Sequence, residues 1–558
     1  MGQKMNEIKQ IIARAVKSDF GIDVEPIITR PDPQFGDFAT NIAMQITKQV
    51  GKSPRDIATE LARSLQSAGH QVTVAGPGFL NVRVSDETLK TMLEAATMLP
   101  QPLAGKVVVA EYSDPNPFKV LHAGHLYTTI VGDAVASVLQ SAGATVHRVN
   151  FGGDVGLHVG KTMWAILQEL GGEHPDKLQQ VDQSSRLEWL SARYVDGNEA
   201  YETNQEAKQA ITELNKRVYE LHSANDHESA FAKVYWTCRT WSYEGFDKLY
   251  VQLQVHPFEY MPESEVTPLG IQTVEKGLQD GLLQRSDGAV VFKGEQFGLH
   301  TRVFMNSNGL PTYEAKDLGL AATKWQKYHF DHSFIITAND IVQYMKVVMK
   351  VLEHFYPEAT QRTTHLTHGV IKLPGGVKMS SRKGNILRAV DILDAAAAAN
   401  HEQTGKDDEQ VVLGAVKYAF LKQRIGSDIV YDPSESVSVQ GNSGPYLQYA
   451  YARAKSIMTK STGVVSRAYS SEFNEQERLL ALKVSEFPEV IEKVLQELMP
   501  HHICTYLYEL TQEFNRFYEK EKVIGSDKEI DRLTLLSHYM GVLKKGLELL
   551  GIQTPDTM

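Results

Sequence analysis

Two short segments that lie far apart in the sequence carry residue types suited to binding phosphate groups. In the first, His122, Gly124 and His125 stand where a helix is predicted to begin, directly after an apolar strand. A helix N-terminus presents unpaired N–H groups and partial positive charge, so it attracts anions. The two histidines share one face of that helix and can donate to phosphate oxygens. Gly124 has no Cβ and leaves room for an adenine ring beside the backbone.

In the second segment, Lys378, Met379, Ser380 and Ser381 lie in a loop bounded by glycines. A lysine on a mobile loop can move onto phosphates as their charge shifts, which stabilises the transition state selectively. Taken alone, the first segment is equally well explained as a helix start with two incidental histidines, and the second is better explained as a solvated basic loop. Both segments fall on the same predicted sheet, however, and this pairing favours a two-part triphosphate site.

An alternating pattern of strand and helix predicts how these segments are held. Residues 106–110 form an apolar strand run, a helical stripe covers 122–143, and residues 145–149 form the next strand. This β-α-β unit predicts an α/β fold with a doubly wound, Rossmann-like parallel sheet. We expect the sheet to resume at 289–292 and 334–336, with the second segment in its last loop.

The chain has 558 residues, too many for one hydrophobic core, so several domains are expected. Apolar positions recur at helical spacing towards the C-terminus, which predicts an all-α bundle there. We predict an N-terminal α+β module over 1–97, a catalytic domain over 98–395 with a helical insertion from about 160 to 285, a connecting stem over 396–435, and a helical domain over 436–558.

Composition excludes several classes of protein. No apolar run approaches the length of a membrane span. Cys238 and Cys504 supply neither a zinc-binding spacing nor a disulfide framework, which fits a reducing cytoplasm. The net charge of −11 argues against sequence-blind nucleic-acid binding over the whole surface, but it leaves a local basic face possible.

The residues around both segments resemble the class I aminoacyl-tRNA synthetases, and more narrowly the arginine–tRNA ligases, over nearly the whole chain. The most specific matches are the spacing from Glu111 to the two histidines and the string Gly-Pro-Tyr-Leu-Gln-Tyr-Ala at 444–450. Other matches are Gly153-Asp154-x-Gly156, Tyr313-x-x-x-Asp317 and residues 549–552 followed by Met558.

This resemblance implies an enzyme that activates L-arginine with ATP to arginyl-adenylate and transfers the arginyl group to the 3′ end of tRNA(Arg). It implies that His122, His125, Lys378 and Lys119 act on ATP, which arrives with Mg²⁺. The division of labour between Lys119, Lys378 and Arg382 stays open. The ATP-binding set is then His122, Gly124, His125, Lys378, Met379, Ser380 and Ser381.

An arginine side chain carries five donors on a planar fork and keeps its charge, so a selective pocket needs fixed carboxylates. The resemblance places Tyr313 and Asp317 at the guanidinium end of the substrate. It places Glu111 and Asn116 near the amino and carboxylate groups, with Gln343 as a further lining residue. Without the resemblance, Asp317 is better explained as part of a solvated helix face.

The resemblance also implies RNA contacts at both ends of the chain. The N-terminal module would touch the tRNA, with Phe79 stacking on a base and Asn81 bonding its edge, although Phe79 is equally well explained as an inward strand residue. Tyr449 and Met558 are the predicted anticodon contacts, although most aromatic residues of the bundle are better explained by core packing. We expect a monomer without membrane contact that needs bound tRNA before it activates arginine.

Two other functions compete with this interpretation. A nucleotidyltransferase that acts on a small acid without RNA would share the sheet, but it would need neither terminal module. A non-enzymatic RNA-binding paralogue would share the shape, but it would have no need to keep His122, His125, Lys378, Glu111 and Asp317. An assay with labelled arginine and total tRNA separates the three functions.

Overall fold

The computed structural model describes residues 3–372, 374, 387–461 and 469–558, so the second phosphate-binding segment predicted from the sequence lies outside the described residues. The chain divides into two compact units, which are described separately. The smaller unit comprises residues 1–100, 446–548 and 553–558, and the larger unit comprises 101–445 and 549–552.

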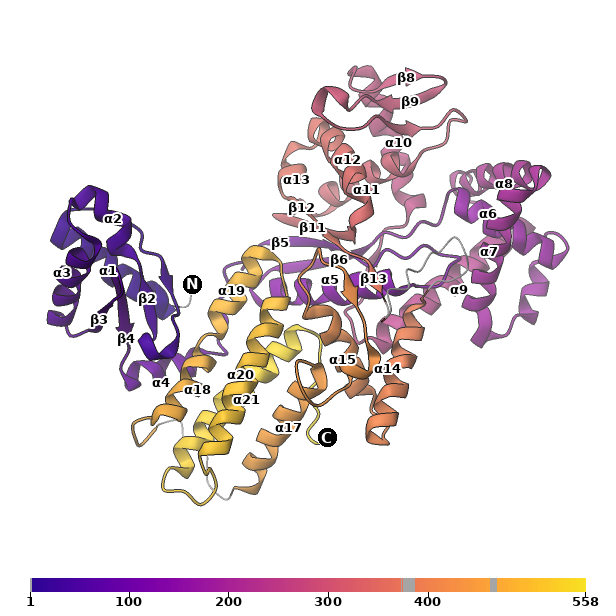
Figure 1. The fold of residues 1–558 in the computed structure, drawn as a ribbon. Coiled ribbons are helices and arrows are strands. Elements are labelled where there is room, and N and C mark those ends of the chain that lie inside the picture. The colour runs from indigo at the N-terminus through magenta and orange to yellow at the C-terminus, as the bar shows by residue number, and fades with distance from the viewer. Residues whose placement is uncertain (1–2, 373, 375–386, 462–468) are drawn as a thin grey trace. The chain divides into compact units, whose positions relative to one another are not determined.

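A five-stranded, all-parallel sheet forms the centre of the larger unit (Figure 1). Its strand order is β12-β11-β5-β6-β7. The strands are β5 (Val107–Glu111), β6 (Thr145–Asn150), β7 (Glu259–Tyr260), β11 (His332–Ala338) and β12 (Thr363–His368). The predicted α/β fold with a doubly wound parallel sheet is confirmed.

Helices cover both faces of this sheet. On one face, α5 (Ala123–Ser141) packs against β5, β6 and β11. On the other face, Val109 and Val149 of the sheet pack in one apolar cluster with Val266, Leu320 and Ala359. Those three residues belong to α10 (Glu263–Gln279), α11 (Tyr313–Tyr328) and α13 (Pro357–Gln361).

The order of the strands reverses at β5. The chain runs outwards from β5 to β6 and β7, and later returns to the other side of β5 with β11 and β12. In open parallel sheets, such a switch point leaves a crevice outside the carboxyl ends of the strands, and ligands bind there. The connection after the carboxyl end of β5 leads to His122, and the next element in the chain is α5, so the fold places His122 at this crevice.

The expectation that the parallel sheet resumes at 289–292 is wrong. This segment is β9 (Ala289–Phe292), which pairs antiparallel with its neighbours in a separate three-stranded sheet. The neighbours are β8 (Gln284–Ser286) and β10 (Arg302–Met305). Its side chains Val290 and Phe292 pack with α11 and α12 (Val342–Phe355). The apolar run therefore belongs to the hydrophobic core around these two helices and not to the core of the parallel sheet.

The predicted insertion is mainly helical and has a core of its own. Its helices are α6 (Leu157–Leu170), α7 (Arg186–Thr203), α8 (Gln205–Ser223) and α9 (Ala230–Gln252). After the sheet, the larger unit continues with β13 (Ile371–Lys372), α14 (Ala389–Thr404), α15 (Glu409–Leu421), β14 (Ile429–Val430) and α16 (Pro433–Ser436).

The smaller unit contains the α+β module and the helical bundle that the sequence predicts. Its antiparallel sheet has the order β1-β2-β4-β3 and includes the predicted hairpin. The module consists of α1 (Gln3–Phe20), β1 (Ile28–Thr29), β2 (Phe38–Thr40), α2 (Ile42–Val50), α3 (Pro54–Ser67), β3 (Gln71–Ala75), β4 (Phe79–Arg83) and α4 (Asp86–Ala95). The bundle consists of α17 (Gly444–Lys460, which begins in the larger unit), α18 (Glu475–Ser485), α19 (Phe487–Glu497), α20 (His501–Lys520) and α21 (Glu529–Leu549). None of the described helices is long and apolar enough to cross a membrane.

The connection between β5 and α5 has unusual backbone geometry. Ser113, Asp114 and Phe118 all have positive φ, at 77°, 49° and 66°. Non-glycine residues rarely adopt this conformation, and such strain is kept where it serves a site. Tyr112 anchors the connection, because it is fully buried and its hydroxyl donates to Asp133 Oδ1 at 3.1 Å.

Close packing of α5 on Tyr112 gives the first testable prediction. A Cβ at Gly132 would lie 2.2 Å from Tyr112 Cγ, so Gly132→Ala should destabilise the larger unit by about 1–3 kcal/mol through overpacking. Thermal unfolding measures this loss. Gly541→Ala in α21 is the control, because its Cβ would meet only Thr97 Cγ2 at 3.4 Å. An unchanged midpoint for Gly132→Ala would show that Tyr112 moves aside without cost.

Candidate active site

A pocket of about 300 Å³ lies at the carboxyl ends of the central strands. Ala338 ends β11 and His368 ends β12, and both line the pocket together with the residues that open α5. This position at the switch point is where an open parallel sheet binds a nucleotide. The lining residues include His122, Ala123, Gly124, His368, Ile371 and Leu387.

The chain on both sides of the undescribed segment 375–386 meets this pocket. Ile371 and Leu387 both line it. The Ala123 N–H donates to the Leu387 carbonyl at 2.8 Å, and the Ala389 N–H donates to the Leu121 carbonyl at 2.9 Å. The described residues on either side of 375–386 thus lie beside the start of α5, whereas Lys378, Met379, Ser380 and Ser381 lie outside the described residues.

The two histidines are held in one defined arrangement. His122 is the N-cap of α5, and its Nδ1 accepts from the Gly124 N–H at 3.1 Å. The His122 backbone N–H donates to His125 Nδ1 at 3.3 Å, and the two rings stack with centroids 3.8 Å apart. Because both Nδ1 atoms accept, each neutral ring carries its proton on Nε2 and has one N–H to offer a ligand.

Burial keeps these rings uncharged. Burial, together with the nearby Lys119 and His368, lowers the pKa of His122 to about 4. The pKa of His125 is likewise well below its usual value, because of burial, His122 and Lys119. Gly124 leaves room for this arrangement, because a Cβ at this position would lie 2.9 Å from His122 Cε1 and would displace the ring. The histidines therefore offer directed hydrogen bonds, while the positive charge must come from lysines.

Lys119 is placed to supply part of that charge. Its Nζ lies 4.0 Å from the centroid of the Tyr194 ring on α7. Burial and the nearby Lys161 lower the pKa of Lys119 to about 8, so the ammonium is still mostly protonated at neutral pH. Its positive charge contributes to the lowered pKa of both histidines.

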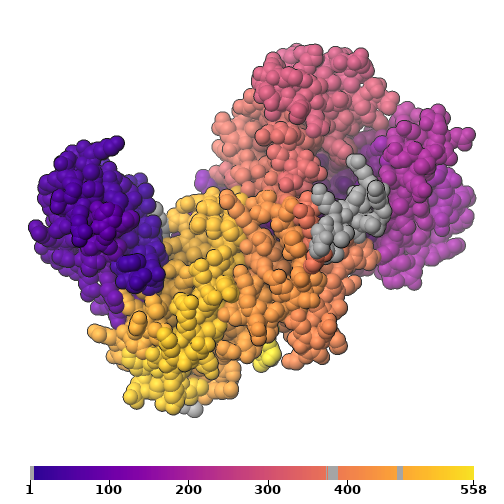
Figure 2. Space-filling view, viewed as in Figure 1, coloured from indigo at the N-terminus to yellow at the C-terminus, as the bar shows by residue number. Residues whose placement is uncertain are grey.

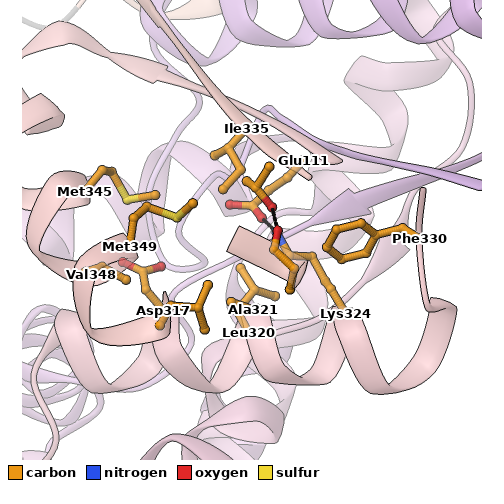
Figure 3. A pocket seen from close by; sticks show the side chains of 13 residues that line it. Glu111, Asp317, Leu320, Ala321, Lys324, Phe330, Ile335, Met345, Val348 and Met349 are labelled. Carbon is orange, nitrogen blue, oxygen red and sulfur yellow. Dashed lines mark hydrogen bonds and ion pairs between the residues drawn. The ribbon is translucent and has the colours of Figure 1, made fainter. Parts of the chain in front are cut away.

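A second group of residues surrounds a small cavity between the central sheet and the helices α11 and α12 (Figure 3). Glu111 enters from the end of β5, and Asp317 and Lys324 come from α11 (Figure 3). Glu111 forms a buried ion pair with Lys324. The cavity measures about 20 Å³, roughly the room for one water molecule, so it does not hold a guanidinium group. The small cavity is instead a largely apolar space next to the carboxylates of Glu111 and Asp317.

Asp317 forms no ion pair among the described residues. Among the described residues its hydrogen bond comes from the Tyr344 hydroxyl, not from a lysine or arginine. Burial, with the nearby Glu111 and Glu263, raises the pKa of Asp317 to about 8 against the lowering effect of the Tyr344 hydroxyl. Burying a carboxylate without a positive partner is costly. A cationic ligand at this carboxylate would remove that cost.

Asn116 and Glu263 extend the same acidic region. Asn116 Oδ1 accepts from the Gly153 N–H at 3.0 Å, and a Cβ on Gly153 would meet both side chains. Glu263 pairs with Lys316 of α11 at 2.5 Å, and both side chains are buried. Asp114 also belongs here, because burial and Glu111 raise its pKa well above the usual value. More carboxylates than lysines therefore meet at this edge of the sheet.

Two predicted substrate residues lie at the margin of this group. Tyr313 begins α11 and is 54% exposed, with Lys316 Nζ 5.1 Å from its ring centroid. Gln343 is exposed on α12 and does not line the small cavity, whereas its neighbour Tyr344 contacts Asp317. Tyr313 and Asp317 share α11 as predicted, but only Asp317 points to the cavity floor.

The predicted RNA contacts in the N-terminal module differ in accessibility. Phe79 begins β4 and is 41% exposed, so its ring is open to a stacking base. Asn81, two residues later, is buried between β2 and β3. An RNA base would reach the Asn81 amide only after neighbouring side chains move.

The predicted anticodon residues lie at the bundle surface. Tyr449 of α17 is half-exposed, and Arg453 stacks on its ring at 4.9 Å and donates to its hydroxyl at 3.3 Å. Arg453 also lies 5.8 Å from the ring of Tyr518 on α20, which is exposed. Met558 is partly exposed at the end of the chain. Aromatic rings interleaved with a guanidinium form the kind of surface on which unpaired bases stack.

Sequence reasoning missed four residues that complete the site: Lys324, Tyr344, Glu263 and Lys316. Lys324 stands two helical turns after Asp317, a spacing that indicates a shared helix face. Its pairing with Glu111 had no such signal, because it depends on how α11 packs on β5. The Glu263–Lys316 pair likewise joins two helices that only the fold brings together.

Comparisons with known proteins assign all three parts of the chain. Residues 88–432 match the family model described as tRNA synthetases class I (R), catalytic domain. Residues 447–558 match the DALR anticodon binding domain, and residues 6–84 match the arginyl tRNA synthetase N terminal domain.

Individual relatives agree with these family models. The chain is 30% identical to the arginine–tRNA ligase of Pasteurella multocida and 29% identical to that of Mannheimia succiniciproducens. These matches cover 94% and 96% of this chain, and 96% of each relative. Its fold resembles that of the arginyl-tRNA synthetase of Thermus thermophilus, with a TM-score of 0.79, 24% identity, and coverage of 99% of this chain and 100% of the other.

The double role of His122 gives a second prediction. His122→Ala removes the helix cap and should cost about 0.5–2 kcal/mol of stability, whereas His122→Asn keeps a capping oxygen. Both variants should bind ATP more weakly, because neither presents the Nε2 donor. Thermal unfolding and equilibrium ATP binding separate the two effects. Wild-type ATP affinity in His122→Asn would show that this imidazole is only a cap.

Proposed function

The chain belongs to the arginine-specific family of class I aminoacyl-tRNA synthetases, and on that premise we propose which of its residues carry the reaction. The reaction is aminoacylation of tRNA(Arg) with arginine, driven by ATP. The arginine carboxylate attacks the α-phosphate of ATP, which forms arginyl-adenylate and releases pyrophosphate. A ribose hydroxyl at the 3′ end of the tRNA then attacks the adenylate carbonyl and releases AMP.

In this proposal ATP binds at the switch-point pocket. The Nε2–H groups of His122 and His125 donate to phosphate oxygens, and Gly124 keeps the space above the first ring open. Because both imidazoles are neutral, the charge that develops on the phosphates is balanced by lysines. Lys119 takes part in this, and Lys378 is assigned the same role, with Met379, Ser380 and Ser381 beside it.

The acidic region binds arginine, and the observation that carries this assignment is the buried carboxyl group of Asp317, which forms no ion pair among the described residues. A guanidinium offers Asp317 the two parallel N–H groups that a carboxylate binds best. Asn116 and Glu111 lie towards the amino and carboxylate end, with Tyr313 at the opening. Glu111 is already paired with Lys324, so its main effect is on the electrostatic potential around the substrate and not direct binding of the substrate's positive groups. Gln343 would need to turn inwards to take part.

Further proposals concern the partners of the reaction. ATP is used with Mg²⁺, which the triphosphate and water would hold, because no cluster of three or more His, Cys, Asp or Glu side chains suited to a metal occurs in the described part of the chain. The chain acts as a monomer, because one chain supplies the described residues of both halves of the site. It works in the cytoplasm, where its two buried cysteines stay free thiols.

The terminal parts of the chain bind the tRNA body. Phe79 stacks on a base, and Asn81 bonds to it after a local rearrangement. Tyr449 and Met558 contact the anticodon, with Tyr449 held in place by Arg453.

The assignment of Asp317 predicts how arginine use depends on pH. Arginine binds the ionised carboxylate, whose pKa in the free enzyme is about 8. Below that pH, binding must release a proton, so the KM for arginine should rise about tenfold per pH unit as the pH falls below about 8 and should level off above it. Steady-state kinetics at saturating ATP and tRNA measure this slope.

Two variants test the origin of this slope. Tyr344→Phe removes a hydrogen bond that lowers the pKa of Asp317, so the break in the profile should move to higher pH. Asp317→Asn should abolish the slope and raise the KM by a factor on the order of 10² or more, since loss of one partner of a buried charge pair costs about 3–5 kcal/mol. A wild-type profile in Asp317→Asn would refute the assignment.

The function itself is tested by charging. Purified protein with ATP, Mg²⁺, labelled arginine and total tRNA should form labelled tRNA that is sensitive to mild base. We further expect no pyrophosphate exchange until tRNA is added. Failure to charge tRNA would exclude the function, whereas full exchange without RNA would contradict only the tRNA requirement.

A further inference from the structure

Two arginines join the N-terminal module to the helical bundle within the smaller unit. Arg478 lies on α18 and reaches from the bundle to the module, whereas Arg30 follows β1 and reaches from the module to the bundle. Their side chains are largely buried, with 8% and 14% of their surfaces exposed. The two contacts join residues that stand 441 and 459 positions apart in the sequence, so only the fold brings them together. Figure 2 shows the module in indigo and the bundle in orange to yellow.

The Arg478 guanidinium contacts the module at three points. Its Nη1 donates to Asp86 Oδ1 at 2.5 Å, and its Nη2 donates to Asp37 Oδ2 at 2.6 Å and to the Val84 carbonyl at 2.9 Å. Asp37 Oδ2 also accepts from the Val84 N–H at 2.7 Å. These acceptors stand just before β2, just after β4 and at the start of α4. Because a guanidinium is planar and its donor directions are fixed, this one side chain sets the orientation of all three elements on α18.

The Arg30 guanidinium forms a second bridge at a different place. Its Nε and Nη2 donate to the two carboxylate oxygens of Glu489 on α19, each at 2.8 Å. The same group lies 4.7 Å from the centroid of the Phe38 ring on β2. A single bridge would let the module turn about it, but two bridges to two different helices prevent that rotation. We call the following five residues the double arginine bridge: Arg30, Glu489, Arg478, Asp37 and Asp86.

Strand β4 connects the double arginine bridge to a predicted RNA contact. Val84 follows this strand and Phe79 begins it, so the two residues lie about 17 Å apart along an extended chain. β4 pairs with β2 on one side and with β3 on the other, which makes it stiff. The exposed Phe79 ring is therefore held at a fixed place relative to the bundle, and α17 of that bundle carries Tyr449.

We propose that the double arginine bridge sets the spacing between Phe79 and Tyr449, so that one tRNA contacts both surfaces at the same time. This inference rests on the proposed function. When two contacts are held at one spacing, the second forms without a further loss of orientational freedom, and the overall affinity exceeds that of either contact alone. Arg30 and Arg478 are then positioning residues, since neither is assigned to RNA.

Stability alone is a poor explanation of the double arginine bridge. A buried ion pair requires desolvation of both charges, and its replacement by apolar side chains is often neutral for stability. Apolar packing has no preferred direction, whereas an arginine that binds carboxylates through several N–H groups does. The double arginine bridge therefore suits a contact whose orientation matters.

A double-mutant cycle tests the proposal through tRNA affinity. In the wild-type protein, Phe79→Ala should weaken tRNA binding about tenfold, the order of one stacked base. Arg478→Met should weaken binding by a similar factor and should make it insensitive to Phe79→Ala, because the released module no longer adds its contact. At saturating tRNA, Arg478→Met should keep the turnover and the KM for arginine of the wild-type protein.

Arg532→Met is the matched control. Arg532 is a buried arginine with two carboxylate partners, Glu477 and Glu521, but all three residues belong to the bundle. Its loss should lower the thermal midpoint, yet Phe79→Ala should still weaken tRNA binding about tenfold in this background. Thermal midpoints are measured for every variant, and binding is measured well below them.

Arg30→Met tests the other bridge and serves if Arg478→Met does not fold. Its partner Glu489 keeps 17% of its surface exposed, so water can reach the carboxylate that the substitution leaves behind. This variant should likewise reduce the effect of Phe79→Ala on tRNA affinity.

Two results would overturn the proposal. An equal loss from Phe79→Ala in the wild-type, Arg478→Met and Arg30→Met proteins would show that the double arginine bridge only supports the fold. Unchanged tRNA affinity in Phe79→Ala alone would show that the module makes no contact that needs positioning. In both cases charging of tRNA by the wild-type protein would still support the proposed function, so the two failures are distinguishable.

Discussion

Buried negative charge that is only partly matched organises the acidic half of the site. Glu111 is paired with Lys324 and Glu263 with Lys316, and both lysines come from α11. The same helix carries Asp317, which has the Tyr344 hydroxyl as its hydrogen-bond donor. With these neighbours paired, Asp317 is a buried acid that forms no ion pair among the described residues, and it stays protonated near neutral pH because a buried single ion costs far more than a buried pair. The protein thus keeps open the position that a cationic substrate would fill.

The end of β5 joins this acidic half to the nucleotide half. Glu111 is the last residue of β5 and His122 caps α5, so the connection between them borders both. Its three left-handed residues store strain that the buried Tyr112 and the packing of α5 hold in place. On the nucleotide side the rings are neutral and direct hydrogen bonds, while lysines bring the charge. Direction and charge are therefore supplied by different residues.

The local sequence pattern was enough to predict β5, α5 and β6, and therefore the position of His122 and His125 at the start of a helix. It failed where pairing between distant segments decides. An apolar run at 289–292 looks the same whether its partners are parallel or antiparallel. β12 reads Thr-Thr-His-Leu-Thr-His and offers no apolar run, yet it is a strand of the central sheet. A strand of two residues, such as β7, leaves no periodicity to detect.

The same limit applies to single side chains. Adjacent helix residues point about 100° apart, so a prediction that selects Gln343 instead of Tyr344 selects a different face of α12. The sequence also does not reveal that Asn81 is buried, because β4 is a central strand and its middle residues are buried on both faces; its contact with RNA stays a prediction.

The raised pKa of Asp317 has a consequence for substrate discrimination. On the proposed assignment, the side chain is a carboxylic acid at neutral pH in the free protein and becomes a carboxylate when arginine binds. A neutral urea such as citrulline presents a carbonyl oxygen where arginine has an N–H group, and a protonated acid can donate to that oxygen. The protein's preference for the charged side chain over its uncharged isostere is therefore not a fixed ratio. The preference for arginine weakens as the pH falls and strengthens as the pH rises, so the selectivity of the protein depends on pH as well as on the shape of the pocket.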